Sequence, residues 1–236
     1  MPQVPPPKRH PYDQWSPDAR ALDLVGDKWT LLIVRDLSAG PRRFVELQRV
    51  LPGISTEQLR SRLNRMVADG MLTRKRYREV PPRVDYELTA RARDLMPILG
   101  ELACWGYRWA WGAPRPGERV DVSAIFRLIP GLVEGNGHRG EVELTVTDGH
   151  RDGGPTTYTV DMTGEHVELH EQPGSQPAAR VSGDTAAWTR AFAPGTDDAA
   201  LHFSGDRPLA DSLIGQLSRA ALQHGSASDT VERQVA

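Results

Sequence analysis

The sequence has a single cysteine, Cys104, among 236 residues, which excludes an intrachain disulfide and a cysteine-rich zinc site. Long hydrophobic runs are missing too, because no segment approaches the roughly 20 consecutive apolar residues of a membrane-spanning helix. The first residues, MPQVPPPKRHPYD, are rich in proline and have no apolar core of the kind that a signal peptide carries. These absences favour a protein of the reducing cytoplasm that has no membrane partner.

Motifs of catalysis and cofactor binding are also absent from the sequence. It contains no Gly-x-Ser-x-Gly, no phosphate-binding loop and no His-Glu-x-x-His. The glycine-rich segment 131–140 does not lead from a strand into a helix, as a dinucleotide site requires. His166 and His170 share one face of an expected strand, but a zinc site needs three or four convergent ligands. We therefore expect no enzyme activity, no cofactor and no metal.

Charge is distributed unevenly along the chain. Residues 1–120 contain 21 Lys and Arg against 14 Asp and Glu, whereas residues 121–236 contain 8 against 17. The overall net charge of −2 thus hides a basic half joined to an acidic half. Such asymmetry is typical of a module that binds a polyanion and is fused to a module of another kind.

Apolar periodicity and turn residues predict three short helices at the start of the basic half. They are expected from Asp18 onward, over residues 28–37 and over residues 43–51. Pro52-Gly53 then forms a tight turn. A fourth helix follows at once, because Ser55 is a good N-cap and Gln58, three residues later, completes a capping box.

This fourth helix ends at Gly70, the usual residue type after a helix C-terminus. Two strands are expected at residues 71–73 and 84–88, with Pro81-Pro82 at the tip of the hairpin. Thr89 caps a long last helix that reaches about Trp111 and is kinked at Pro97. Helix, helix, turn, helix, two-stranded ribbon and helix is the order of a winged helix-turn-helix.

The fourth helix has two faces of different chemistry. An apolar stripe formed by Leu59, Leu63, Met66 and Val67 faces the core. The opposite face offers side chains that hydrogen-bond to base edges: Gln58, Ser61, Asn64 and Arg65. Basic residues on its flanks and on the ribbon suit phosphates. The predicted DNA-binding set is Arg43, Ser55, Thr56, Gln58, Arg60, Ser61, Arg62, Asn64, Arg65, Lys75, Arg76 and Arg83. The alternative is a helix that is merely charged and solvated.

Five segments carry a resemblance to a known family: GDKW (26–29), GPRRF (40–44), LPGIS (51–55), DGML (69–72) and VPPRVDYELT (80–89). The chain resembles the HxlR-type branch of the MarR-like winged-helix regulators over roughly residues 12–112. The resemblance implies a homodimer, more often a repressor, that binds palindromic double-stranded DNA. It also implies a recognition helix at Ser55–Val67 and a wing at residues 73–86.

One departure from the family pattern concerns a cysteine that many members carry before the first helix. Ser16 stands at this position, and a hydroxyl cannot undergo thiol oxidation. Cys104 is expected to be a buried packing residue on the last helix. Trp105 and Trp109 are interpreted as part of the apolar stripe of a dimerisation helix, and a role in a ligand-binding cage is the alternative.

The acidic half predicts a second domain. Alternating segments at residues 141–149, 156–164 and 166–172 indicate strands joined by hairpins. This second domain resembles the sterol-carrier-protein type, which encloses an apolar tunnel. The repeated SGD, at 182–184 and 204–206, carries the resemblance. The resemblance implies a hydrophobic small-molecule effector. Candidate lining residues, all equally explained as core, are Phe126, Leu132, Val146, Val160, Trp188, Phe192, Phe203 and Ile214.

Together these observations predict an α+β chain. A winged helix-turn-helix domain, mostly α with a two-stranded wing, occupies residues 12–112. A linker at 113–121 precedes an α+β domain with an antiparallel sheet at 122–224, and residues 1–11 and 225–236 are expected to be disordered. The predicted function is DNA-binding regulation with a ligand-sensing second domain. The alternatives are a lipid-carrier or enzyme-accessory protein whose winged helix contacts proteins, and a regulator whose second domain is inert.

Overall fold

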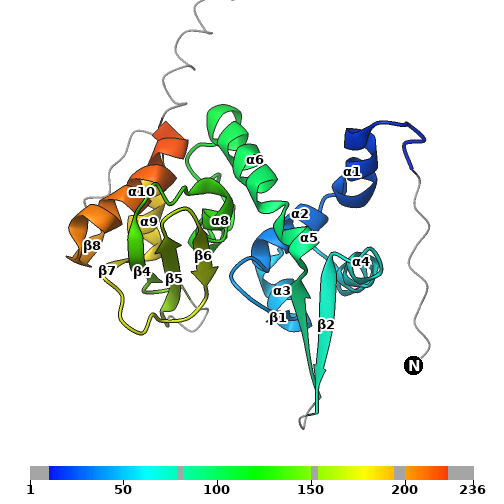
Figure 1. The fold of residues 1–236 in the computed structure, drawn as a ribbon, viewed down its shortest axis with the longest axis horizontal. Helices are drawn as coiled ribbons and strands as arrows, with labels where there is room; N and C mark the ends of the chain where they lie inside the picture. Colours follow the sequence, from blue (N-terminus) through cyan, green and yellow to red (C-terminus); the bar gives the residue numbers. More distant parts are fainter. Residues whose placement is uncertain (1–10, 79–81, 150–153, 194–199, 223–236) are drawn as a thin grey trace, which may run out of the picture. The chain divides into compact units, whose positions relative to one another are not determined.

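A computed structural model describes residues 11–78, 82–149, 154–193 and 200–222 of the chain, with side chains up to residue 218. The chain divides into two compact units, residues 1–96 and 97–236, which we call the N-terminal and C-terminal units (Figure 1). The predicted arm and tail lie outside the described residues, apart from Pro11. Within the described part, every helix is too short or too polar to cross a bilayer.

The helices and the wing of the N-terminal unit follow one another in the order that the sequence predicts, with one additional short strand. Its three-stranded sheet, in the order β1-β3-β2, is antiparallel throughout. The elements are α1 (Pro17–Val25), α2 (Thr30–Asp36), β1 (Arg42–Arg43), α3 (Phe44–Val50), α4 (Thr56–Ala68), β2 (Leu72–Tyr77), β3 (Arg83–Leu88) and α5 (Ala90–Arg93). Strands β2 and β3 pair from Leu72–Leu88 to Tyr77–Arg83 and form the wing.

The start and end signals of α4 are confirmed in the structure. The Ser55 hydroxyl accepts a hydrogen bond from the Gln58 N–H at 3.1 Å, and the Gln58 Oε1 accepts one from the Ser55 N–H at 3.1 Å. Gly70 adopts a φ of +70°, a conformation that disfavours other residues. Leu59 and Leu63 are completely buried, so the stripe predicted to face the core does so.

A short strand, β1, was not expected from the sequence. Arg42 and Arg43 pair with Tyr86 and Asp85 of β3, and α3 begins only at Phe44. The Glu46 carboxylate accepts a hydrogen bond from the Arg43 N–H at 2.7 Å, which stabilises this late helix start. Such pairing joins residues more than 40 positions apart and leaves no local pattern in the sequence.

The long last helix predicted over residues 89–111 is two helices. Thr89 caps α5 as predicted, because its hydroxyl accepts a hydrogen bond from the Ala92 N–H at 3.4 Å. The helix stops at Arg93, and α6 (Met96–Trp109) begins two residues beyond Asp94. Pro97 lies in the first turn of α6, where a missing N–H costs no hydrogen bond. The predicted kink is therefore a break.

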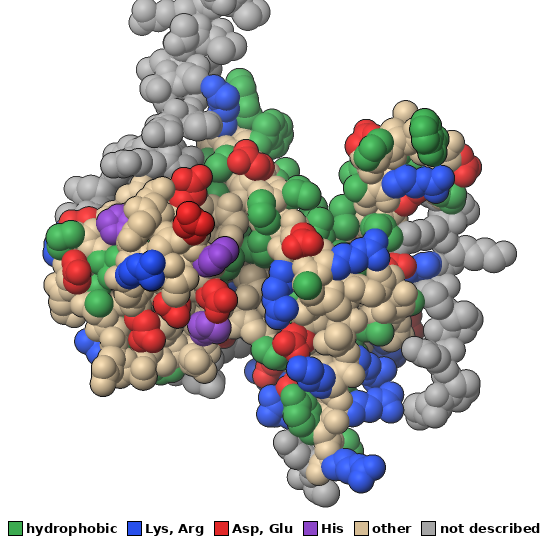
Figure 2. Space-filling view, viewed as in Figure 1, with side chains coloured by type: hydrophobic (Ala, Val, Ile, Leu, Met, Phe, Trp, Pro, Cys, Tyr) green, Lys and Arg blue, Asp and Glu red, His purple; other side chains and the backbone are tan. Residues whose placement is uncertain are grey.

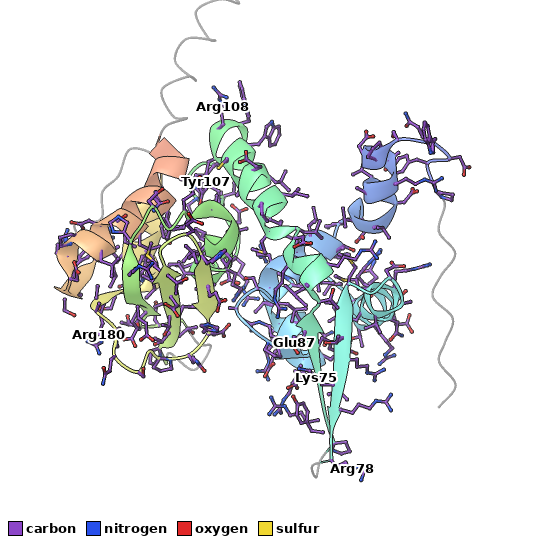
Figure 3. All side chains as sticks on the ribbon, viewed as in Figure 1. Lys75, Arg78, Glu87, Tyr107, Arg108 and Arg180 are labelled. Carbon is purple, nitrogen blue, oxygen red and sulfur yellow. The ribbon has the colours of Figure 1, made fainter. Side chains whose placement is uncertain are left out.

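Helix α6 packs within the C-terminal unit, although the predicted first domain extended to residue 112. A Cβ atom on Gly100 would lie 1.9 Å from the carbonyl oxygen of Gly131, so the two backbones touch there. The Trp111 indole N–H donates a hydrogen bond to the Phe192 carbonyl at 3.1 Å. Tyr107 on α6 is buried and meets the Trp111 ring edge-on at 5.4 Å (Figure 3).

The rest of the C-terminal unit is a five-stranded sheet with helices. Its strand order is β6-β5-β4-β7-β8. The elements are α7 (Val122–Phe126), α8 (Ile129–Leu132), β4 (Arg139–Val146), β5 (Thr156–Thr163), β6 (Val167–His170), β7 (Ala179–Gly183), α9 (Thr185–Phe192), β8 (His202–Gly205) and α10 (Arg207–Leu222). The α+β class is as predicted.

The prediction of an antiparallel sheet is wrong for one pair, because β4 and β7 are parallel. Strands β5 and β6 lie on one side of β4 as a meander. The chain then passes back across the sheet, where the Gln172 carbonyl accepts a hydrogen bond from the Thr159 hydroxyl at 2.7 Å. The Gly174 N–H likewise donates to Glu143 of β4 at 3.2 Å. This crossing brings β7 to the other side of β4 in the same direction.

The repeated SGD segments have the same role at both positions, although Gly205 has a φ of +81° and Gly183 does not have a positive φ. Each glycine ends a strand, and each aspartate caps the helix that follows. The Asp184 carboxylate accepts a hydrogen bond from the Ala187 N–H at 2.7 Å, and Asp206 accepts one from the Leu209 N–H at 3.1 Å. The repeat is therefore explained by two strand-to-helix turns.

Candidate nucleic-acid interface

The polar face of α4 is partly open to solvent in the described part of the chain. Ser61 is exposed, and Asn64 and Arg65 are half-buried on the side away from Leu63. These three side chains have the donors and acceptors needed for base edges in a major groove. Their placement agrees with the helical spacing that predicted them.

Two other residues of the predicted DNA-binding set are already engaged at the start of α4. The Gln58 side chain uses its Oε1 in the capping box, so only its NH₂ group is left for a base. The Thr56 hydroxyl accepts a hydrogen bond from the Gln48 side chain of α3 at 2.8 Å. A bidentate contact of Gln58 with adenine would therefore cost the cap one of its two hydrogen bonds.

Arg62, predicted to contact phosphate, lies against the start of α2. Its Nη1 atom is 2.9 Å from the Asp27 Oδ2 atom. Only 29% of the Arg62 side chain and 23% of the Asp27 side chain are exposed. The guanidinium is therefore held inside the unit, unlike that of Arg60, which lies exposed two residues earlier.

The wing pairs much of its positive charge with acids. The Lys75 Nζ atom is 2.5 Å from the Glu87 Oε2 atom on the neighbouring strand, and Arg93 lies 3.6 Å from the other oxygen (Figure 3). The hydrogen bond to Glu87 and its negative charge raise the pKa of Lys75 above its usual value. Lys75 is thus an ammonium that already has a carboxylate partner.

Asp85, at the base of the wing, is almost completely buried among arginines. Its carboxylate receives a hydrogen bond from Arg83 at 2.9 Å and lies 3.9 Å from the Nε atom of Arg43. The Arg83 guanidinium also stacks over the Tyr77 ring at 5.2 Å. Arg43 and Arg83, both predicted phosphate ligands, therefore share a buried counter-ion.

Two arginines of the wing were missing from the predicted set. Arg74, on β2, and Arg78, the residue directly after β2, are exposed and alternate with Arg76, which places Arg74 and Arg76 on one face of the strand. Arg78 lies near the far end of the wing (Figure 3), and basic side chains gather along the wing in the space-filling view (Figure 2). The period of two in RKRYR was the signal that could have identified them.

The structure also shows the surroundings of Ser16, which stands where many family members have a cysteine, and of Cys104. The Ser16 hydroxyl caps α1 by accepting a hydrogen bond from the Ala19 N–H at 3.4 Å. Cys104, predicted to be buried, is only half-buried. Burial and the nearby Glu101 carboxylate raise the pKa of its thiol, which disfavours the reactive thiolate.

The candidate ligand residues of the C-terminal unit lie mostly in its core. The Phe126 ring meets those of Trp188, Tyr158 and Phe192 edge-on, with centroids 4.8, 5.6 and 6.2 Å away. The Trp188 indole N–H donates a hydrogen bond to the Thr145 carbonyl at 2.9 Å. Six of the eight candidates are buried and two are half-buried, namely Leu132 and Phe203.

The capped helix α4, the turn before it and the two-stranded wing after it define a winged helix-turn-helix protein. Comparison with known proteins gives the family: residues 24–113 match the HxlR-like helix-turn-helix family. A helix-turn-helix transcriptional regulator of Halalkalibacterium halodurans is 43% identical over 96 residues, which cover 40% of this chain and 85% of the relative. A regulator of the same type from Synechocystis is 41% identical over 93 residues, covering 39% of this chain and 69% of the relative.

Among solved structures, a MarR-family transcriptional regulator from Porphyromonas gingivalis is 37% identical. The match covers 40% of this chain and 92% of that protein, with a TM-score of 0.39. On the strength of the sequence relatives, the chain belongs to the HxlR-like helix-turn-helix family through its N-terminal part. These relatives are transcriptional regulators, which supports DNA binding by the N-terminal unit.

Proposed function

We propose that this protein is a homodimeric transcriptional repressor that binds palindromic operator DNA through α4 and the wing. The observation that carries the proposal is the open polar face of α4, with Ser61, Asn64 and Arg65 free of the helix-capping contacts. The exposed arginines of β2 supply phosphate contacts that position this face. The family membership of residues 24–113 supports the same function.

The ion pairs of the wing differ in how readily DNA could open them. The Lys75 side chain is 55% exposed, and solvent weakens an exposed ion pair, so a phosphate can compete for this ammonium. Asp85 is buried, and removing its partner would leave an uncompensated charge. We infer that Lys75 turns to DNA on binding, whereas Arg83 stays with Asp85.

A dimer is supported by an apolar stripe on α6. Ile98, Leu102, Trp105 and Trp109 follow one another at helical spacing and are each at least half exposed to solvent. A contiguous apolar surface of this kind marks an interaction site. We infer that a second copy of the chain covers it, because a palindromic operator needs two recognition helices related by a two-fold axis.

The test of DNA binding is a mobility shift on the upstream region of the protein's own gene, with scrambled DNA as competitor. Several Lys and Arg contacts predict that affinity falls by orders of magnitude between about 50 and 200 mM salt. Equal binding to scrambled DNA would contradict the reading of a specific operator, and binding that is absent or independent of salt would favour a winged helix that contacts proteins. Light scattering of the same samples tests the dimer, and a Trp109→Glu variant is expected to be monomeric.

We further infer that the C-terminal unit senses an apolar small molecule. The support is the cluster of aromatic rings around Phe126 and its link to the end of α6, because Trp111, two residues after that helix, is hydrogen-bonded to the Phe192 carbonyl. A ligand that separates these rings would shift α9 and thereby α6, which carries the proposed dimer stripe. Binding to one arrangement in preference to another would then change the affinity for DNA.

Sensing is tested with the intact protein. Truncation at residue 113 would remove the segments on which α6 packs and would expose the packed side of α6. Fatty acids and sterols are titrated while tryptophan fluorescence and operator affinity are measured together. A ligand that changes both is expected. Operator affinity that is unchanged by every ligand that alters the fluorescence would argue for a C-terminal unit without a sensing role.

A further inference from the structure

The ion pair between Asp27 and Arg62 connects the recognition helix to the start of α2. The Asp27 Oδ1 atom accepts hydrogen bonds from the Trp29 and Thr30 N–H groups at 2.8 and 3.1 Å. Its Oδ2 atom accepts one from the Thr30 hydroxyl and lies 2.9 Å from the Arg62 Nη1 atom. One carboxylate therefore closes the first turn of α2 and holds α4 at the same time.

The surroundings make this carboxylate a rigid anchor. Thr30, which it contacts twice, is almost completely buried. Gly26, directly before Asp27, cannot carry a side chain without conflict, since a Cβ would lie 2.6 Å from the Leu22 carbonyl oxygen. On the other side of the pair, the Arg62 Nε atom is buried and has no hydrogen-bond partner among the described residues. Asp27 is thus the acid that holds this guanidinium in the described part of the unit.

The ion pair adds a directional restraint to the apolar stripe that packs α4 on the core. Leu59, Leu63 and Met66 pack through contacts that have little directional preference. A charge-assisted hydrogen bond is directional and short. Arg62 is adjacent in sequence to Ser61 and one helical turn from Arg65, so a rotation that breaks the pair also turns the polar face.

We propose that Asp27 is a positioning residue for DNA reading: through Arg62 it sets the rotation at which α4 presents Ser61, Asn64 and Arg65 to base edges. In this arrangement Arg62 belongs to the scaffold and does not bind phosphate. The inference rests on the proposed DNA-binding function and adds to it the residue that orients the recognition helix.

The experiment compares two duplexes of about 30 bp, long enough for two half-sites. One is the duplex that the wild-type protein enriches from a random library, and the other is an unselected duplex. Asp27→Asn keeps a side-chain oxygen for the backbone N–H groups and removes the charge. Arg62→Met removes the guanidinium but keeps an unbranched chain. The double variant completes the cycle, and Arg60→Met is the matched control on the exposed flank.

For Asp27→Asn and Arg62→Met we expect the affinity for the selected duplex to fall roughly tenfold, as for a lost base contact. Affinity for the unselected duplex and the salt slope are expected to stay at their wild-type values. The double variant should be no worse than either single variant, because both break the same pair. Arg60→Met should weaken both duplexes alike and lower the salt slope by about 1.

The opposite pattern would overturn the proposal. If Arg62→Met behaves like Arg60→Met, or if Asp27→Asn strengthens binding to both duplexes, Arg62 is a phosphate ligand. Thermal unfolding is followed for every variant, and if Asp27→Asn does not fold, Arg62→Met and Arg62→Lys decide the question from the other side of the pair. Arg62→Lys retains a cation for Asp27 and is expected to keep more selectivity than Arg62→Met.

Failure of the proposed function would look different. A wild-type protein that enriches no duplex and does not bind the unselected one would contradict DNA binding itself. Binding by the wild type with additive losses in the double variant would contradict only the coupling of Asp27 to Arg62.

Discussion

The two units of this protein bury different kinds of side chain. The interior of the N-terminal unit is largely aliphatic, and Ile33 and Leu63 are among its fully enclosed residues. The C-terminal unit instead buries a group of aromatic rings in mutual contact: Phe126, Tyr158, Trp188 and Phe192. Their charges differ too, since the basic half of the sequence supplies the winged helix and the acidic half supplies the sheet unit (Figure 2).

This contrast is between a unit distinguished by its polar surface and a unit distinguished by its apolar interior. The groups that distinguish the N-terminal unit are polar and lie on its surface, as a partner made of base edges and phosphates requires. The groups that distinguish the C-terminal unit are apolar and lie inside it. Changes in the C-terminal interior should therefore act mainly on stability, and changes on the N-terminal surface mainly on binding.

The largest effect is expected from Trp188→Ala. This change removes a completely buried ring and its hydrogen bond to the Thr145 carbonyl, so the free energy of unfolding of the C-terminal unit should fall by about 3–5 kcal/mol. Differential scanning calorimetry measures the loss. Trp15→Ala is the control, because that ring is 95% exposed and lies outside the α6 stripe, and an equal loss there would contradict the division between core and surface.

Alkaline pH should destabilise the C-terminal unit through Tyr107. Burial raises the pKa of its phenol from 10.0 to about 12. Folding favours the neutral phenol, so the full stabilisation is present below pH 10 and is lost as the pH rises to about 12. Two pKa units correspond to about 2–3 kcal/mol. Urea unfolding at several pH values measures the loss, and Tyr107→Phe should remove this part of the pH dependence.

Arg65→Ala tests the surface of the N-terminal unit. We expect the affinity for the selected operator to fall by about 1–3 kcal/mol and selectivity at one base step to relax. Fluorescence anisotropy measures the affinity. Arg180→Ala is the control, since that side chain is 55% exposed in the acidic unit and pairs with Glu143 (Figure 3). Equal losses from both variants would mean that α4 does not read bases.

The smallest effect is expected from Glu87→Gln. It removes the carboxylate that pairs with Lys75 and Arg93, and solvent weakens exposed ion pairs, so stability should change little. DNA affinity at low salt should increase because Lys75 is released for phosphate. A decrease in affinity would show that the pair orients the wing for binding.

Prediction from the sequence succeeded where the signal is local. The cap of α4 depends on Ser55 and Gln58, three residues apart, and its end depends on Gly70 alone. The exposed face then follows from helical periodicity. The short strand β1 and the break before α6 were missed, because the first depends on pairing with β3 and the second on how the following residues pack.

The sequence by itself determined the order of elements in the N-terminal unit, the face of α4 that points away from the core and the opposite charges of the two halves. Only the tertiary structure decided which basic residues already have acidic partners. Asp27 and Arg62 lie 35 positions apart, and Asp85 on β3 faces Arg43 on the neighbouring strand β1. It also decided which side of α6 is covered, through the contact of Gly100 with Gly131. Hydrogen bonds within a helix follow from neighbouring residues, whereas ion pairs and backbone contacts depend on where distant segments meet.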